Sequence, residues 1–99
     1  MSLEPDYTDW QQLMDLVKDA AADDQHTLLL TMMMTPDERE ALVARLNIVS
    51  ELLKGDKSQR QISQMLGVGI ATITRGSNEL KAKSDTERQQ IARLILKQD

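Results

Sequence analysis

The chain has 99 residues, no cysteine and a formal net charge of −4 at neutral pH. Without cysteine it can form neither a disulfide framework nor a thiolate metal site, and no apolar run approaches the roughly 20 residues of a membrane span. The first ten residues are acidic and lack an apolar run, so they predict no signal peptide, and we expect a cytoplasmic protein outside any membrane.

The charge is distributed unevenly along the chain. Residues 1–53 hold eleven acidic and three basic side chains, residues 54–83 hold two acidic and six basic ones, and residues 84–99 hold three of each. A basic segment in an otherwise acidic chain is typical of a protein that contacts phosphates with one surface and is repelled from DNA elsewhere.

Two helices are predicted before residue 35. Residues 7–22 place apolar side chains, Trp10 among them, on one face at three- and four-residue spacing, and we interpret Trp10 as a packing residue. Residues 27–34, TLLLTMMM, are almost wholly apolar. A strand is the competing local interpretation, but Leu and Met favour helix and no other strand is predicted to pair with it. So apolar a segment should be covered by a second chain.

A long central helix is predicted over residues 36–54. Thr35 is a favourable cap, Pro36 fits the first helical position, and Gly55 follows the last turn. Its apolar stripe is wide enough to touch several partners: Leu42, Leu46, Val49 and Leu53, flanked by Val43, Ile48 and Leu52. Arg45 lies among these apolar residues and needs a partner, either a ligand or a surface ion pair.

Residues 58–82 form a predicted helix-turn-helix. Ser58 and Gln61 fit a capping box, and Gly67 fits the left-handed position that ends a helix. Gly69 is expected to turn the chain again before the second helix. The positions that hold the two helices together carry suitable residues: Ser63 at the contact, with Ile62, Leu66, Val68 and Ile73. A helical hairpin without a nucleic-acid role is the alternative.

The second helix of this motif has short side chains suited to a major groove. Threonine can meet thymine methyls, base edges or phosphates, and Arg60 can reach a guanine edge or a phosphate. The predicted DNA-binding residues are Gln59, Arg60, Gly69, Ile70, Ala71, Thr72, Thr74 and Lys81.

Gly76 occupies a position where a helix-turn-helix usually has a large aliphatic side chain, and Arg75 lies beside it. Either Gly76 is a packing or kink glycine, or it leaves a gap that something else fills. A last helix begins near Ser84. We expect an all-α fold of six helices in a single domain over residues 1–99, with core helices in 1–57, the helix-turn-helix in 58–82 and a C-terminal core helix in 83–99.

These segments resemble the Trp repressor family of tryptophan-responsive bacterial regulators. The similarity lies in LTMMMTPDEREALVARL (residues 30–46), SQR (58–60) and ISQMLGVGIATITRGSNELK (62–81), and it is looser in the first helix. ATITRGSN after a helix-turn-helix turn is highly specific, and TPDERE supports the resemblance independently. The resemblance implies an intertwined homodimer whose two subunits share one core.

It also implies that L-tryptophan binds as a corepressor between that core and the helix-turn-helix. The indole would lie between the guanidinium groups of Arg45 and Arg75, which can stack on an aromatic face, and Gly76 would leave room for the ring. The backbone carbonyls of Met32 and Met34, near the helix start at Thr35, would accept hydrogen bonds from the ligand ammonium.

Two positions depart from familiar members of the family. Glu79 stands where a serine lies near the ligand ammonium, and its carboxylate could pair with that ammonium or repel a nearby phosphate. Ser63 stands where a basic residue is common, which removes one possible phosphate contact.

The expected function is therefore an L-tryptophan-activated, sequence-specific repressor of tryptophan biosynthesis or uptake genes. It would bind operator double-stranded DNA as a homodimer and need no cofactor besides the corepressor. The alternative is a family paralogue that responds to another small ligand or to none. An enzyme has no support, because the sequence offers neither a nucleophile–base pair nor a metal cluster. A helical interaction module that never binds DNA is a third possibility.

Overall fold

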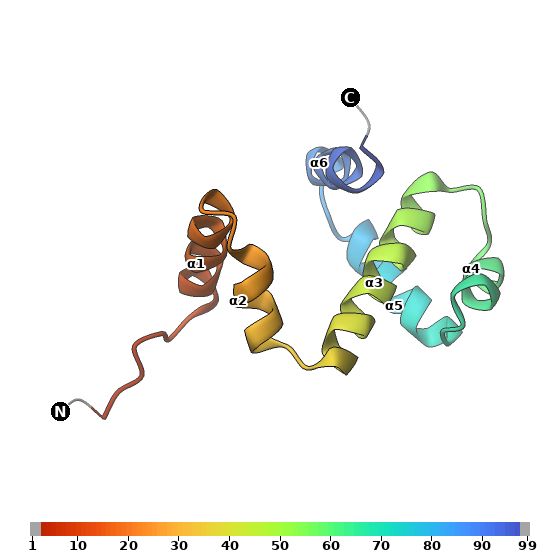
Figure 1. Cartoon of the computed structure of the whole chain (residues 1–99). Helices are drawn as coiled ribbons and strands as arrows, with labels where there is room; N and C mark the ends of the chain where they lie inside the picture. Colours follow the sequence, from red (N-terminus) through yellow and green to blue (C-terminus); the bar gives the residue numbers. More distant parts are fainter. Residues whose placement is uncertain (1–2, 98–99) are drawn as a thin grey trace. The chain divides into compact units, whose positions relative to one another are not determined.

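The computed structural model describes residues 3–97, and these residues form six α-helices and no strand. The helices are α1 (Trp10–Ala22), α2 (His26–Met33), α3 (Pro36–Lys54), α4 (Gln59–Leu66), α5 (Ile70–Lys81) and α6 (Asp85–Leu96) (Figure 1). The chain divides into two compact units, Met1–Arg39 and Glu40–Asp99. No described helix is both long and apolar enough to cross a membrane.

The predicted helices are confirmed, with one correction at the first. We expected that helix to begin at Tyr7, but α1 begins at Trp10. Asp9 caps it, because its carboxylate accepts a hydrogen bond from the Gln12 backbone N–H at 2.8 Å while the Gln12 side chain accepts from the Asp9 N–H at 3.1 Å. This reciprocal capping box outweighs the apolar spacing that suggested an earlier start.

The corner between α2 and α3 is closed by two local interactions. Thr35 and Glu38 form the predicted helix start: the Glu38 N–H donates to Thr35 Oγ1, and the Thr35 N–H donates to the Glu38 carboxylate at 2.8 Å. These bonds hold the pKa of Glu38 below its usual value. Arg39 donates to the carbonyls of Thr31 and Met34, which satisfies two acceptors at the end of α2.

The helix-turn-helix lies in the unit Glu40–Asp99 and packs on α3. Ser58 caps α4 in the predicted box with Gln61, and Gly67 ends it at φ +67°, a left-handed conformation that favours glycine. Ile62 and Ile73 are completely buried where α4 meets α5, together with Ile48 of α3. The residues predicted to hold the two helices together therefore do so.

The connection from α5 to α6 is held by one arginine. Arg88 donates to the carbonyls of Leu80, Lys81 and Lys83 and pairs with Asp85. The last helix begins where it was predicted, and Ser84 caps it. The same guanidinium thus satisfies orphan carbonyls at the end of α5 and joins the first turn of α6.

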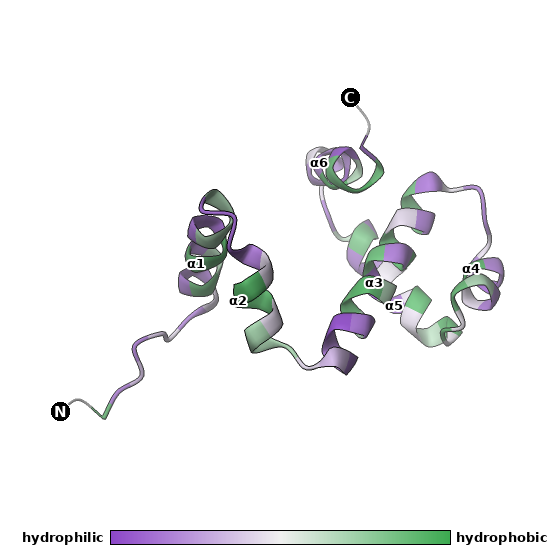
Figure 2. Cartoon of the chain, viewed as in Figure 1, coloured by the Kyte–Doolittle hydropathy of each residue, from purple (hydrophilic) through white to green (hydrophobic). Residues whose placement is uncertain are grey.

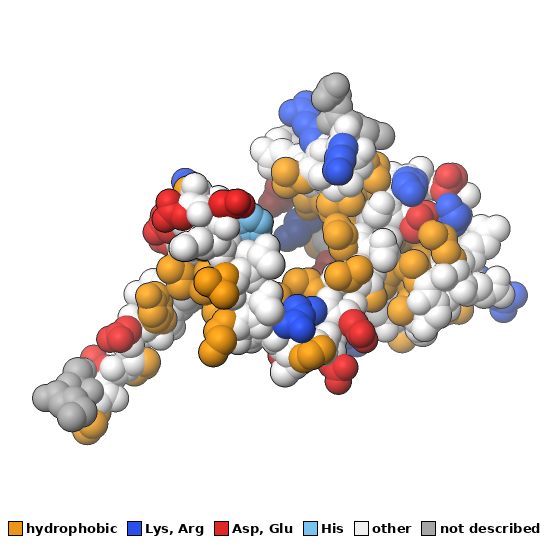
Figure 3. Space-filling view, in the orientation of Figure 1, with side chains coloured by type: hydrophobic (Ala, Val, Ile, Leu, Met, Phe, Trp, Pro, Cys, Tyr) orange, Lys and Arg blue, Asp and Glu red, His pale blue; other side chains and the backbone are white. Residues whose placement is uncertain are grey.

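A single chain leaves most of its apolar surface uncovered. Only three apolar side chains in the described part of the chain are buried, namely Ile48, Ile62 and Ile73. Helix α2 is apolar along much of its length (Figure 2), yet Leu28 is 72% and Met32 85% exposed. Apolar side chains also open onto the surface in the space-filling view (Figure 3). Trp10, expected to pack, is 70% exposed. These apolar faces require a partner surface.

Glu51 fixes the connection between α3 and the helix-turn-helix. Its carboxylate is almost buried and pairs with Lys57 at 3.0 Å and with Lys54 at 3.2 Å. The hydrogen bond from Lys57 is the main reason that the pKa of Glu51 lies below its usual value, and the same bond raises the pKa of Lys57. The ion pair between Glu51 and Lys57 thus anchors the segment just before Ser58 to α3.

Replacing Glu51 with Gln should therefore lower the urea midpoint at neutral pH, measured at one fixed protein concentration. Because the folded pKa of Glu51 is lowered, its stabilisation is complete above the unfolded value of about 4.3 and is lost as the pH falls through the folded value. Because the pKa of Lys57 is raised, the stabilisation that its charge contributes is lost only in strong alkali. The gap between wild type and variant should stay constant from about pH 6 to 9 and close in acid. A gap of the same size at about pH 3 would contradict this account.

Candidate ligand pocket and helix-turn-helix surface

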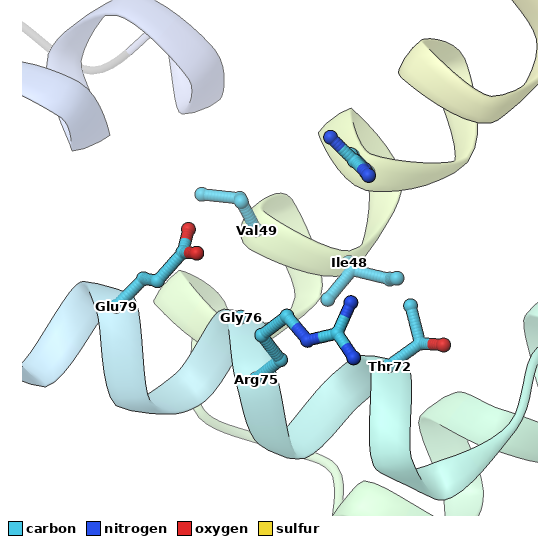
Figure 4. Close-up of a pocket in the computed structure, with 7 residues that line it drawn as sticks. Ile48, Val49, Thr72, Arg75, Gly76 and Glu79 are labelled. Atoms are coloured by element: carbon cyan, nitrogen blue, oxygen red, sulfur yellow. The ribbon is translucent and has the colours of Figure 1, made fainter. Parts of the chain in front are cut away.

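A cavity of about 130 Å³ lies between α3 and α5 (Figure 4). Helix α3 contributes residues at positions i, i+3 and i+4, and α5 contributes one face at the same helical spacing. All the lining residues belong to the unit Glu40–Asp99: Arg45, Ile48, Val49, Thr72, Arg75, Gly76 and Glu79. The two arginines and the glycine that the sequence predicted for a ligand site thus line one cavity, together with Glu79.

Gly76 has two roles in this arrangement. A Cβ at this position would lie 3.3 Å from Ile48 Cγ2 and 3.8 Å from Leu52 Cδ1. The absence of a side chain therefore lets α5 come close to α3, as the packing alternative predicted. Gly76 also lines the cavity, so a larger residue would both press on Ile48 and narrow the space.

The charged side chains of the cavity do not neutralise one another. Arg75 and Glu79 are four residues apart on α5, a spacing at which opposite charges can pair. No ion pair joins Glu79 to Arg75 or Arg45 among the described residues. Arg75 extends toward Ile48 and Thr72, and the carboxylate of Glu79 lies on the side of Val49 (Figure 4). The cavity therefore presents positive and negative groups in different places.

Three residues predicted for the ligand site, Met32, Met34 and Thr35, belong to the unit Met1–Arg39 and do not line this cavity. The Met34 carbonyl already accepts a hydrogen bond from Arg39 at 3.2 Å. A carbonyl oxygen has two lone pairs, so this bond leaves room for a second donor. Their role toward a ligand stays a prediction.

The helix-turn-helix is fixed by side-chain hydrogen bonds. Ser63 Oγ donates to the Val68 carbonyl at 2.5 Å, across the turn that Gly67 makes possible. Thr74 Oγ1 donates to the Gln59 side-chain oxygen at 2.9 Å and so joins α4 to α5. Two of the predicted DNA-binding residues therefore hold each other in place, and the Gln59 amide group keeps its own two donors.

The other predicted DNA-binding residues lie at the start of α4, directly before α5 and along α5. Exposed side chains are found at Arg60, Ile70, Ala71, Thr72 and Lys81. Thr72 also lines the cavity, so one residue touches both predicted sites.

Gly69 lies directly before α5, where the chain was expected to turn, but the turn there does not depend on glycine. Its φ of −68° is open to any residue, and a Cβ there would meet nothing within 4 Å. The fold of this chain therefore gives no reason for glycine at this position. Close approach of a ligand or a DNA backbone would give one.

Ile48 and Val49 were not predicted as site residues, although they form the apolar part of the cavity. The sequence placed them in the wide apolar stripe of the central helix. The available signal was their spacing, three and four residues after Arg45, which puts all three on one face. No group of His, Asp or Glu in the described chain could hold a metal ion.

Comparison with known proteins gives consistent matches over almost the whole chain. Residues 8–95 match the sequence model of a family described as Trp repressor protein. Proteins named Trp operon repressor homolog are similar in Vibrio atlanticus (72% identical over 98 residues, 99% of this chain and 100% of the relative) and in Vibrio cholerae (66% over 96 residues, 97% and 93%). The homolog of Aliivibrio fischeri is 61% identical over 97 residues, covering 98% of this chain and 90% of the relative.

Proposed function

The chain belongs to the Trp repressor family, and we propose from this membership and from the cavity that it is an L-tryptophan-activated transcriptional repressor. It is a DNA-binding regulator and not an enzyme. Its ligand is the corepressor L-tryptophan, and its target is operator DNA of genes for tryptophan biosynthesis or uptake. A bacterial repressor acts where the chromosome lies, so we place its work in the cytoplasm.

The observation that carries this proposal is the cavity beneath α5. An apolar cavity of about 150 Å³ can hold a benzene ring, so a space of about 130 Å³ with an open side is of the right order for an aromatic ring. Ile48, Val49 and Gly76 offer the ring apolar contacts. Arg45 and Arg75 supply planar guanidinium groups, which stack on aromatic faces and bind carboxylates.

The position of the cavity explains how a ligand could control DNA binding. Arg75 and Gly76 lie in the middle of α5, whose exposed residues Ile70, Ala71 and Thr72 form the predicted groove-reading surface. A ligand in the cavity would fix the tilt of α5 against α3. Helix-turn-helix dimers, of which Trp repressors are a known example, need two such helices about one DNA turn apart, roughly 34–36 Å.

We further propose that the working form is a homodimer. A core of three buried apolar side chains cannot stabilise a chain of this length, because small domains depend on burying a large share of their surface. Leu42 and Leu46 lie one turn apart on α3 and are each 51% exposed, and Leu94 of α6 is 79% exposed. A second copy of the chain would cover such faces and bring two groove-reading helices together.

The corepressor proposal predicts a change in operator affinity. L-tryptophan should tighten binding to an operator duplex by about 5- to 150-fold per coupled site, the range of ordinary allosteric coupling. In Arg75→Ala, affinities with and without L-tryptophan should be nearly equal, with helix content unchanged because Arg75 is exposed. Fluorescence anisotropy of a labelled duplex measures the operator affinities with and without L-tryptophan. Arg93→Ala, which removes an exposed arginine of α6 outside the cavity, is the matched control.

Equal operator affinity with and without L-tryptophan in the wild-type protein would reject the proposed control. A full response retained in Arg75→Ala would place the ligand somewhere other than this cavity.

The dimer proposal predicts that Leu46→Glu separates the chains. Burying one leucine side chain is worth about 1.5–3 kcal/mol, and a two-fold interface contains it twice, so the dimer Kd should rise at least a hundred-fold. Sedimentation equilibrium measures this change. Asn47→Asp adds a charge to the adjacent exposed position and should leave the dimer intact. Monomeric wild-type protein at micromolar concentration would contradict the proposal.

A further inference from the structure

Three cations of the basic segment over residues 54–83 are already engaged. Lys54 and Lys57 pair with the carboxylate of Glu51, and Arg75 lines the cavity. The other three are exposed and make no ion pair in the described part of the chain: Arg60, Lys81 and Lys83. These three side chains are therefore the ones in this segment that are free to neutralise phosphates.

Lys83 follows the end of the helix that we propose to read the DNA groove. Lys81 is the last residue of α5, and Lys83 lies two residues further on. The 12 residues of α5 extend over about 18 Å, whereas the major groove of B-DNA is about 12 Å wide. With Ile70 and Ala71 at the start of α5 in the groove, the other end of the helix lies at the groove edge. Both lysines are then beside the phosphate backbone.

A side chain of the next helix holds the backbone from which these lysines extend. The guanidinium of Arg88 donates to the carbonyls of Lys81, at 3.3 Å, and of Lys83. It also donates to the Leu80 carbonyl at 3.4 Å, and it pairs with Asp85 in the first turn of α6. These contacts engage backbone carbonyls and leave the two lysine ammonium groups free. The end of α5 is thus fixed without neutralising its positive charge.

We propose that Lys83 is a further phosphate-binding residue and that Arg88 is the positioning residue that holds Lys81 and Lys83 beside the DNA backbone. Each lysine neutralises one phosphate, and the fork of the guanidinium keeps both in register with α5. Phosphate contacts of this kind fix the position of a protein on the duplex but carry no sequence information. The inference rests on the proposed DNA binding and is independent of which ligand occupies the cavity.

The salt dependence of operator binding tests the contact made by Lys83. Fluorescence anisotropy of a labelled duplex is measured with saturating L-tryptophan over a range of KCl concentrations. Each phosphate contact adds about 0.9 to the slope of log affinity against log salt, and a homodimer has two copies of Lys83. In Lys83→Ala the slope should be shallower by about 2, on the operator and on an unrelated duplex alike. Lys18→Ala, which removes an exposed lysine of α1, should leave the slope unchanged.

Arg88→Lys tests the positioning role, because lysine keeps the positive charge but lacks the planar fork that reaches several carbonyls. Operator affinity at about 0.1 M salt should fall roughly ten-fold, and the salt slope should become shallower. The affinity for L-tryptophan without DNA, measured by calorimetry, should stay unchanged, since Arg88 does not line the cavity. Arg93→Lys, the same change at an exposed position of α6, is the matched control.

A double-mutant cycle shows whether Arg88 acts through the lysines. In a protein that already carries Lys81→Ala and Lys83→Ala, adding Arg88→Lys should cost little further operator affinity. A loss as large as in the wild-type background, or an equal loss of L-tryptophan affinity, would overturn the positioning role. An unchanged salt slope in Lys83→Ala would overturn the phosphate contact. These results would leave the repressor function standing, whereas failure of the wild-type protein to bind operator DNA would overturn both.

Discussion

Helix α5 packs on α3 at Gly76, where a methyl group would lie only 3.3 Å from Ile48 Cγ2. The helices meet at a residue without a side chain, and the larger side chains around the contact enclose a cavity instead of filling it. The contact is therefore close at one point and incomplete beside it. An incomplete contact beneath α5, the helix that we propose to read the DNA groove, is a place where a small molecule can supply the missing packing. The control that we propose depends on this feature.

The same incompleteness appears at the level of the whole chain. Apolar side chains on α2, α3 and α6 remain exposed, so one chain cannot complete its own core. By contrast, the local structure is well defined: capping boxes start α1, α4 and α6, and Glu51 and Arg88 fix the connections before and after the helix-turn-helix. The chain thus forms well-defined helices and packs α3, α4 and α5 around three buried isoleucines, but it leaves much of its other apolar surface for a second chain and a ligand to cover. A second chain and a ligand that bind only the folded chain also stabilise it, so folding, dimer formation and ligand binding are linked equilibria.

Local interactions explain why so much of the fold could be predicted from the sequence. The cap at Ser58, the end of α4 at Gly67 and the start of α6 near Ser84 involve residues within a few positions of one another, and all three were predicted. The start of α1 was misplaced because apolar spacing was given more weight than the capping box of Asp9 and Gln12. Exposure of Trp10 could not be predicted, because spacing identifies an apolar face but not the surface that covers it.

The cavity was only partly predictable. Arg45 was singled out as a charged residue among apolar neighbours, and Arg75 as the neighbour of an unusual glycine. The family resemblance then assigned both arginines to one ligand site. Ile48 and Val49 could not be distinguished from the rest of the α3 stripe, because the distinction depends on the path of α5, which is fixed by contacts distant in sequence. Gly69 was assigned a backbone role that its φ of −68° does not require.

The central claim is that the ring of L-tryptophan lies between α3 and α5. Isotope-filtered NMR of the protein with unlabelled L-tryptophan tests this claim most directly, because it detects protons of ligand and protein that lie within a few ångströms of each other. The account predicts contacts from the indole protons to the methyl groups of Ile48, Val49 and Thr72. Indole contacts confined to the apolar groove of Leu16, Leu28 and Met32, with none to Ile48 or Val49, would contradict it.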